Sequence, residues 1–132
     1  MKINRREFLV LTATFVAGCS SVENLGAPSG RNRVVNAGRI SNYAADGIYT
    51  AFRAQGFFII RQSGRLFVLS SICTHRRCLV ETARDHSFLC PCHGSTFDPN
   101  GHVTHGPAKR DLPALETFTN EKSELLVKMP AD

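Results

Sequence analysis

The chain has 132 residues, of which 42% are hydrophobic and 20% charged, and this length and composition indicate one globular domain. The formal net charge is +5. This charge is too mild for nucleic-acid binding, and no basic run interleaves with aromatic residues, so nucleic acid is excluded as an expected partner. The five cysteines are informative, because a disulfide among them would place the protein in an oxidising compartment.

The first segment, residues 1–19, has the composition of a targeting signal. It opens with a cationic stretch and continues with a largely apolar region of eleven residues, Phe8 to Gly18. This run is too short to span a bilayer, because a spanning helix needs about 20 residues. The stretch Asn4-Arg-Arg-Glu-Phe-Leu9 resembles a twin-arginine export signal, the route that carries folded proteins. A basic start of the general secretory type is the alternative.

Cys19 ends this segment in the sequence Val16-Ala-Gly-Cys19, which resembles a bacterial lipobox. In such signals, cleavage leaves the cysteine as a lipidated N-terminus, and more than one acyl chain gives stable membrane anchoring. An ordinary cleavage site with an incidental cysteine is the alternative. Residues 20–32 contain serine, glycine and proline, which is typical of a flexible tether, and the folded domain is expected over residues 33–132.

From residue 33 the pattern is that of short β-strands separated by turns. Apolar or β-branched runs alternate with clusters of Gly, Asn, Pro and Ser, without a long helical period or an internal repeat. Short strands with regular turns predict an all-β domain, a small antiparallel β-sandwich or barrel. The expected strands cover residues 34–40, 48–52, 57–61, 66–71, 79–83, 87–89, 97–98, 102–104, 115–119 and 124–128.

Two short stretches carry candidate metal ligands. Cys73 and His75 stand one residue apart, Cys90 and His93 stand two apart, and fourteen residues separate the pairs. Two thiolates and two imidazoles suit either zinc or a [2Fe–2S] centre. Zinc fingers usually pair Cys with Cys and His with His, whereas here each stretch offers one of each, which favours the iron–sulfur centre. The other histidines lack ligand spacing and are expected on surface loops: His86, His102 and His105.

These residues resemble the two ligand boxes of the Rieske iron–sulfur family, Cys-x-His and Cys-x-x-His. The resemblance covers about residues 56–113 and implies a Rieske-type β-domain with its cluster-binding loops at one end. It implies one [2Fe–2S] cluster per chain, with Cys73 and Cys90 on the buried iron and His75 and His93 on the outer iron. Neutral imidazoles leave such a cluster less negative than four thiolates would, and its potential lies at roughly −150 to +300 mV.

Further family segments occur at matching places. Cys78 and Cys92 match the disulfide that links the two loops in the high-potential branch, with two free buried thiols as the alternative. Ser95 matches a serine whose hydroxyl faces the cluster. Gly106 and Pro107 begin a match to the Pro loop that covers the cluster, with an ordinary Gly-Pro turn as the alternative.

The chain departs from respiratory members of the family at two places. They have a tyrosine where this chain has Phe97, and the missing hydroxyl predicts a lower potential than theirs, though one well above that of ferredoxins. They have Leu-Gly where this chain has Arg76 and Arg77. Two arginines resist entry into an apolar quinol pocket and suit an acidic face on a redox partner, or alternatively they simply point into water.

The Rieske resemblance therefore implies a one-electron carrier. The N-terminal signal, the lipobox and the expected disulfide place it outside the cytoplasm, periplasmic or otherwise in the cell envelope, held to the membrane by lipid. The alternative is a subunit of a larger oxidoreductase, similar to a quinol–cytochrome c reductase or to the small subunit of arsenite oxidase. Expected partners are redox proteins: a cytochrome, a quinol-oxidising subunit or a molybdenum subunit. The sequence contains no phosphate loop, nucleophile elbow or catalytic triad, so no independent catalytic site is predicted.

Overall fold

The computed structural model describes residues 32–131. The predicted targeting segment, its cysteine Cys19 and nearly all of the predicted tether lie outside these residues, so their predictions are not tested by the fold. Within the described part, no helix is both long and apolar enough to cross a membrane.

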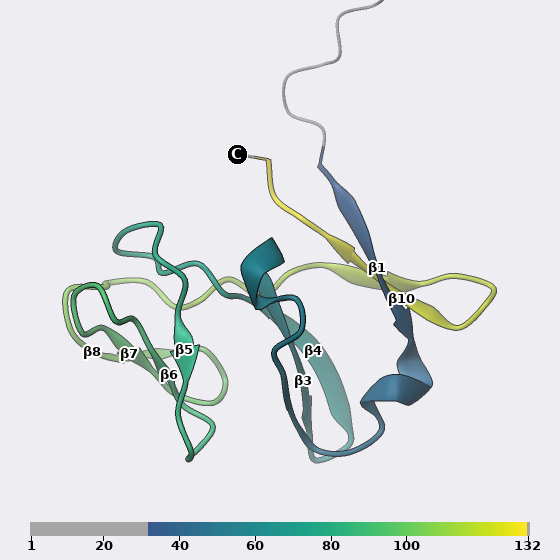
Figure 1. Ribbon diagram of the computed structural model, residues 1–132, viewed down its shortest axis with the longest axis horizontal. Coiled ribbons are helices and arrows are strands. Elements are labelled where there is room, and N and C mark those ends of the chain that lie inside the picture. The colour runs from purple at the N-terminus through teal and green to yellow at the C-terminus, as the bar shows by residue number, and fades with distance from the viewer. Residues whose placement is uncertain (1–31, 132) are drawn as a thin grey trace, which may run out of the picture.

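The described residues form ten strands and two single-turn 3₁₀ helices (Figure 1). All strand pairs within the sheets are antiparallel, which confirms the predicted all-β antiparallel class. In chain order the elements are β1 (Val34–Arg39), η1 (Ile40–Tyr43), β2 (Gly47–Tyr49), η2 (Arg53–Gln55), β3 (Phe57–Gln62), β4 (Arg65–Ser70), β5 (Glu81–Thr82), β6 (Phe88–Leu89), β7 (Thr96–Phe97), β8 (Val103–His105), β9 (Thr117–Thr119) and β10 (Glu124–Lys128).

The strands belong to three sheets, of which two form a base and one belongs to an insert. The base consists of the sheets β1-β10-β9 and β2-β3-β4, and the sheet β5-β6-β7-β8 lies in residues 71–113, which we call the insert. Figure 1 shows β5 to β8 on one side of β3 and β4, with β1 and β10 on the other. The insert starts and ends at one point of the base, because Leu69 bridges Ala114 and the Ser70 N–H donates to the Pro113 carbonyl at 2.8 Å.

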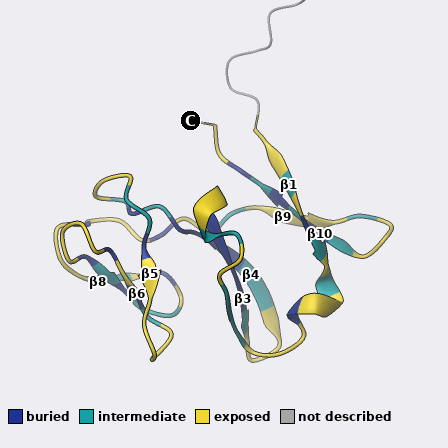
Figure 2. Ribbon diagram, viewed as in Figure 1, coloured by how far each residue is buried: buried dark blue, intermediate teal, exposed yellow. Residues whose placement is uncertain are grey.

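Strand β3 divides the interior into two cores. Its run Phe57-Phe-Ile-Ile60 is buried on both faces, so successive side chains enter different cores (Figure 2). Phe57 and Ile59 pack with the buried side chains of β10, while Phe58 and Ile60 pack with those of the insert. The ring of Phe58 lies 5.1 Å from that of Phe88 on β6, so the insert is packed directly onto the base.

The predicted strands occur, but their bounds differ where turns intervene. The strand expected over residues 48–52 ends at Tyr49, because the chain turns into η2 and leaves it through Gly56 with φ +113°. The strand expected over residues 34–40 ends one residue early, where η1 begins. This short helix places Tyr43 so that its buried hydroxyl donates to the Ala37 carbonyl. No local sequence pattern predicts this contact.

Candidate metal centre

Two loops of the insert carry the predicted ligands. Loop 1, residues 73–78, follows β4, and loop 2, residues 90–95, follows β6. Each loop closes through its first cysteine: the Cys73 N–H donates to the Cys78 carbonyl at 2.7 Å, and the Cys90 N–H donates to the Ser95 carbonyl at 2.7 Å. The two loops are therefore closed by the same kind of hydrogen bond, although the spacing between cysteine and histidine differs, Cys-x-His in loop 1 and Cys-x-x-His in loop 2.

A disulfide joins the two loops. Cys78 and Cys92 are bonded, with their Cα atoms 6.5 Å apart, as the sequence predicted. The Cys90 sulfur lies within 4.8 Å of both sulfurs of this disulfide. Because a disulfide sulfur is not a thiolate, these three cysteines do not form a metal site of their own.

The fold brings the four predicted ligands together at one end of the insert. Cys73 and Cys90 are free, buried cysteines whose side chains are in hydrogen-bond contact. His75 and His93 are exposed, and their ring centroids lie 4.8 Å apart with the planes nearly perpendicular. Two soft donors thus lie inside and two imidazoles lie at the surface, which is a donor set that fits a [2Fe–2S] cluster with histidines on its outer iron.

The two buried thiols differ in acidity. Burial alone raises the pKa of Cys73, but hydrogen bonds from the backbone N–H of His75, from the Cys90 thiol and from the Arg76 N–H outweigh it and leave that pKa lowered. Burial raises the pKa of Cys90, and its thiol hydrogen bond to Cys73 raises it further. Backbone N–H groups of loop 2 oppose this rise. Both loops therefore aim backbone N–H groups at sulfur, an arrangement that favours thiolates.

The predicted Pro loop, residues 106–112, lies against both ligand loops. The buried Ser95 hydroxyl accepts a hydrogen bond from the Ala108 N–H at 3.1 Å and also bonds the Cys73 sulfur. The Thr74 hydroxyl donates to the Arg110 carbonyl at 2.6 Å. Gly106 has φ +97°, and a Cβ there would lie 2.6 Å from the Ser95 Cα, so only glycine allows this approach.

Phe97 is fully buried on β7, opposite Phe88 on β6. It belongs to the same core as Cys73 and Cys90. The phenyl ring supplies packing but no hydrogen-bond donor at this position.

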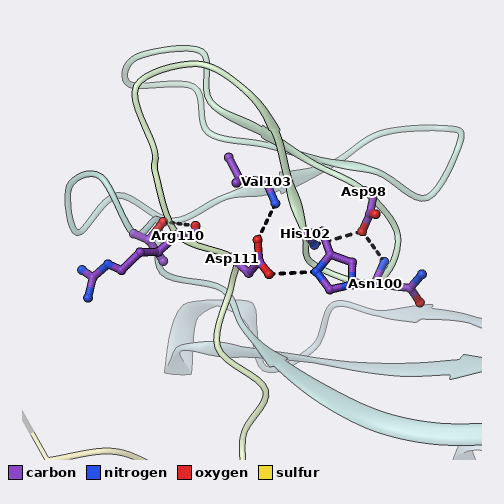
Figure 3. A network of polar contacts seen from close by, with 7 residues as sticks. Asp98, Asn100, His102, Val103, Arg110 and Asp111 are labelled. Atoms are coloured by element: carbon purple, nitrogen blue, oxygen red, sulfur yellow. Dashed lines mark hydrogen bonds and ion pairs between the residues drawn. The ribbon is translucent and has the colours of Figure 1, made fainter.

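A polar network at the far end of the Pro loop was not predicted (Figure 3). The Asp111 carboxylate accepts the Val103 N–H at 2.9 Å and lies 2.8 Å from Nδ1 of His102. The hydrogen bond to Asp111 raises the pKa of His102, and the same bond lowers the pKa of Asp111. Asp98 accepts the N–H groups of Asn100 and His102, each at 2.9 Å.

His102 is therefore exposed, as predicted, but it is paired to a carboxylate nine residues away along the chain. The pairing depends on the return of the Pro loop to β8, which sequence spacing does not reveal. His86 and His105 are exposed as well, and His105 ends β8 opposite Thr96.

Residues 33–118 match the sequence profile of the Rieske [2Fe-2S] domain. The chain belongs to the Rieske [2Fe–2S] family. As a Rieske protein it binds a [2Fe–2S] cluster, and the thiols and imidazoles that the two loops bring together suit that cofactor.

Known Rieske proteins resemble this chain over much of its length. The cytochrome b6-f complex iron-sulfur subunit of Prochlorococcus marinus (strain MIT 9515) is 34% identical over 117 residues, which make up 84% of this chain and 62% of the relative. The subunit of strain AS9601 is 41% identical over 75 residues, which cover 54% of this chain and 42% of the relative. The chain therefore spans between 42% and 62% of the length of these two relatives.

A solved structure supports the fold directly. The crystal structure of the plasma membrane Rieske protein PetC3 from Synechocystis PCC 6803 superposes with a TM-score of 0.55 at 34% identity. The match covers 71% of this chain and 98% of that structure. The Rieske architecture of the described residues thus agrees with that of a known family member of similar size.

Proposed function

We propose that this Rieske protein transfers single electrons in the bacterial cell envelope through a [2Fe–2S] cluster held by Cys73, His75, Cys90 and His93. One observation carries the proposal: two buried cysteines and two exposed, nearly perpendicular imidazoles meet between loops that a disulfide holds together. The buried sulfurs would shield one side of the cluster from water. The histidines would leave its other side at the surface, where a partner can approach.

The cluster supplies one-electron chemistry at a potential that the surroundings tune. Backbone N–H groups of His75 and Arg76 point at the Cys73 sulfur, and those of Cys92 and His93 point at the Cys90 sulfur. These dipoles stabilise the additional negative charge of the reduced state and so raise the potential. The buried Ser95 hydroxyl acts in the same direction, because it also donates toward Cys73.

The assignment to the cell envelope is supported by the disulfide and by the sequence that precedes the domain. Disulfides persist outside the reducing cytoplasm. The cationic and apolar segment of residues 1–19 ends in Cys19, whose lipidation would anchor the domain through the tether of residues 20–32. The related protein of solved structure is named a plasma membrane protein.

A second candidate function is that of a subunit in a larger oxidoreductase. The related chains named above are subunits of cytochrome b6-f complexes, which favours this candidate. The partner would then be a quinol-oxidising subunit or a cytochrome, and a molybdenum subunit is the further possibility that the sequence raised. In either case the chain acts through a protein redox partner.

The decisive experiment is a spectroscopic and redox titration of the full chain purified from membranes. We expect two irons per chain, an EPR signal only after reduction, and a potential between roughly −150 and +300 mV. Cys90→Ser and His93→Ala should abolish or alter that signal, whereas His105→Ala should leave it unchanged. Zinc as the native metal, or a spectrum unaffected by ligand replacement, would disprove the cluster assignment.

A separate experiment tests the membrane anchor. Cys19→Ala should move the protein from the membrane fraction to the soluble fraction without changing the EPR spectrum of the cluster. Membrane partitioning that does not change in this variant would contradict lipid anchoring through Cys19 and leave the redox function untouched. Co-purification from native membranes at low detergent would then separate a free carrier from a subunit of a stable complex.

A further inference from the structure

A groove of about 560 Å³ lies beside loop 1 and extends to the C-terminal end of the base. His75 lines it, together with arginines from three separate segments: Arg33 before β1, Arg76 at the tip of loop 1, and Arg110 in the Pro loop. None of the lining residues within the described part of the chain is acidic. The groove therefore gathers positive charge next to one of the exposed imidazoles.

These arginines are not neutralised inside the described domain. Two ion pairs of the described domain, Arg53 with Glu81 and Lys128 with Glu116, involve none of these three arginines. Arg33 donates to a backbone carbonyl at 3.4 Å, not to a carboxylate. Asp111 follows Arg110 directly, but Figure 3 shows the Arg110 side chain pointing away from the Asp111 carboxylate, which faces His102.

Two arginines outside the groove, Arg53 and Arg61, bond to carbonyl groups inside the fold. The Arg53 side chain donates to the Val80 carbonyl at 2.6 Å, and that of Arg61 donates to the Tyr43 carbonyl at 2.8 Å. The guanidinium groups of Arg76 and Arg110 make no such bond to residues 32–131. Planar guanidinium groups are well suited to bind carboxylates in pairs of hydrogen bonds.

We propose that this arginine groove is the docking site for an acidic face of the redox partner, with carboxylates seated on Arg33, Arg76 and Arg110. The inference rests on the proposed function and specifies its partner. A carboxylate-bearing surface in the groove would lie against His75, the exposed side of the cluster. Complementary charge would increase the rate of encounter and orient the partner, and salt would weaken both effects.

The first test compares two oxidants of opposite charge on the reduced, cluster-bearing protein. Hexacyanoferrate(III) is a trianion, and tris(phenanthroline)cobalt(III) is a trication. The ratio of their rate constants reports the local charge, because a change in cluster potential affects both rates in the same sense. At low ionic strength we expect Arg76→Gln combined with Arg110→Gln to lower the anion-to-cation ratio by about tenfold, and high salt should remove the difference.

Arg84→Gln is the matched control. Arg84 is exposed in the turn between β5 and β6, where the Ala83 N–H donates to the Ser87 carbonyl at 2.9 Å. This turn lies at the end of the hairpin away from both ligand loops (Figure 1). The control removes one positive charge, as each of the two groove substitutions does, so an unchanged ratio in this variant assigns the effect to the groove rather than to net charge.

The second test asks whether the occupant is an acidic protein surface or a membrane. A decaglutamate peptide should slow the reaction of the wild type with hexacyanoferrate(III) and have little effect on the double variant. Vesicles with phosphatidylglycerol serve as the comparison. If the double variant loses vesicle binding but keeps its oxidant ratio and peptide sensitivity, the groove binds lipid headgroups and the proposal is wrong.

The outcomes separate this inference from the proposed function. A protein without a reducible cluster contradicts the function itself. An intact EPR spectrum with the same oxidant ratio in all variants contradicts only the docking site. If the double variant loses its cluster, Arg33→Gln repeats the measurement from outside the ligand loops, and an unchanged ratio in that variant overturns the proposal.

Discussion

The base and the insert of this domain are stabilised in different ways. Strands β3 and β4 pair over six residues, and β3 is buried on both faces. The strands of the insert are two or three residues long, and its loops are joined by a disulfide and by contacts to the Pro loop. Sheets this short are marginal on their own. The base thus depends on apolar burial, whereas the insert depends on cross-links and on its bound cluster.

The largest expected effect comes from breaking the contact between the two regions. Phe57 and Phe58 are adjacent, fully buried residues of β3, and each change to alanine should lower the free energy of unfolding by about 3–5 kcal/mol. Only Phe58 packs against the insert. Phe58→Ala should therefore also speed loss of the cluster, followed by its visible absorption, while Phe57→Ala should not. Equal rates of cluster loss in both variants would show that the two cores act as one.

The disulfide is the next test, because it concerns the insert alone. Replacing both Cys78 and Cys92 with serine should lower the free energy of unfolding by about 3 kcal/mol, since the bond closes a loop with a sequence separation of 14. The expected local result is a cluster that dissociates during purification, while the far-ultraviolet circular dichroism of the base persists. A variant that retains iron and stability would mean that the Pro loop suffices to hold the ligand loops.

Gly106 tests how closely the Pro loop must approach loop 2. Gly106→Ala combines a left-handed backbone with a Cβ 2.6 Å from the Ser95 Cα, so we expect a loss of about 2–4 kcal/mol in unfolding free energy and a changed EPR spectrum. Gly64→Ala is the control, because Gly64 has φ +79° but open space around its Cβ. It should lose only about 1–2 kcal/mol and leave the EPR spectrum unchanged. Similar losses in both variants would refute a specific approach to Ser95.

Phe97→Tyr should affect the potential more than the stability. Phe97 lies in the core that holds Cys73 and Cys90, and we expect a hydroxyl at this position to donate to a ligand sulfur. One hydrogen bond is worth about 1 kcal/mol, which corresponds to about 40 mV for one electron. A redox titration should therefore give a higher potential for the variant than for the wild type. A potential that stays the same or falls would remove Phe97 from the residues that tune the cluster.

The pair of His102 and Asp111 should give the smallest effect, because both side chains are exposed. The pKa of His102 is raised and that of Asp111 is lowered, so the pair stabilises the fold between these two values. Its contribution is lost as pH rises through the raised pKa of His102. Asp111→Asn should return that pKa toward 6.5, as followed by NMR titration of the imidazole. An unchanged titration would assign the raised pKa to another group, with Asp98 as the first candidate.

The sequence predicted the parts of this protein that follow a local residue pattern or a spaced motif. Apolar runs bounded by turn residues indicated β3 and β4, and the resemblance to the ligand boxes indicated which cysteines would be free and which would be bonded. It did not predict contacts that depend on the return of a distant loop, such as that of Asp111 with His102, or the meeting of Arg33 with Arg110 in one groove. Those arrangements arise from tertiary packing, which local propensity and spacing do not encode.

The meeting of Leu69 with Ala114 has a consequence for how such a domain can diversify. Since the chain leaves the base and rejoins it at one place, residues 71–113 can lengthen, shorten or acquire new surface residues without altering the register of β3 and β4. Redox properties and partner choice can thus evolve on a scaffold that stays constant. Exchange of this whole segment between related proteins is the corresponding engineering route.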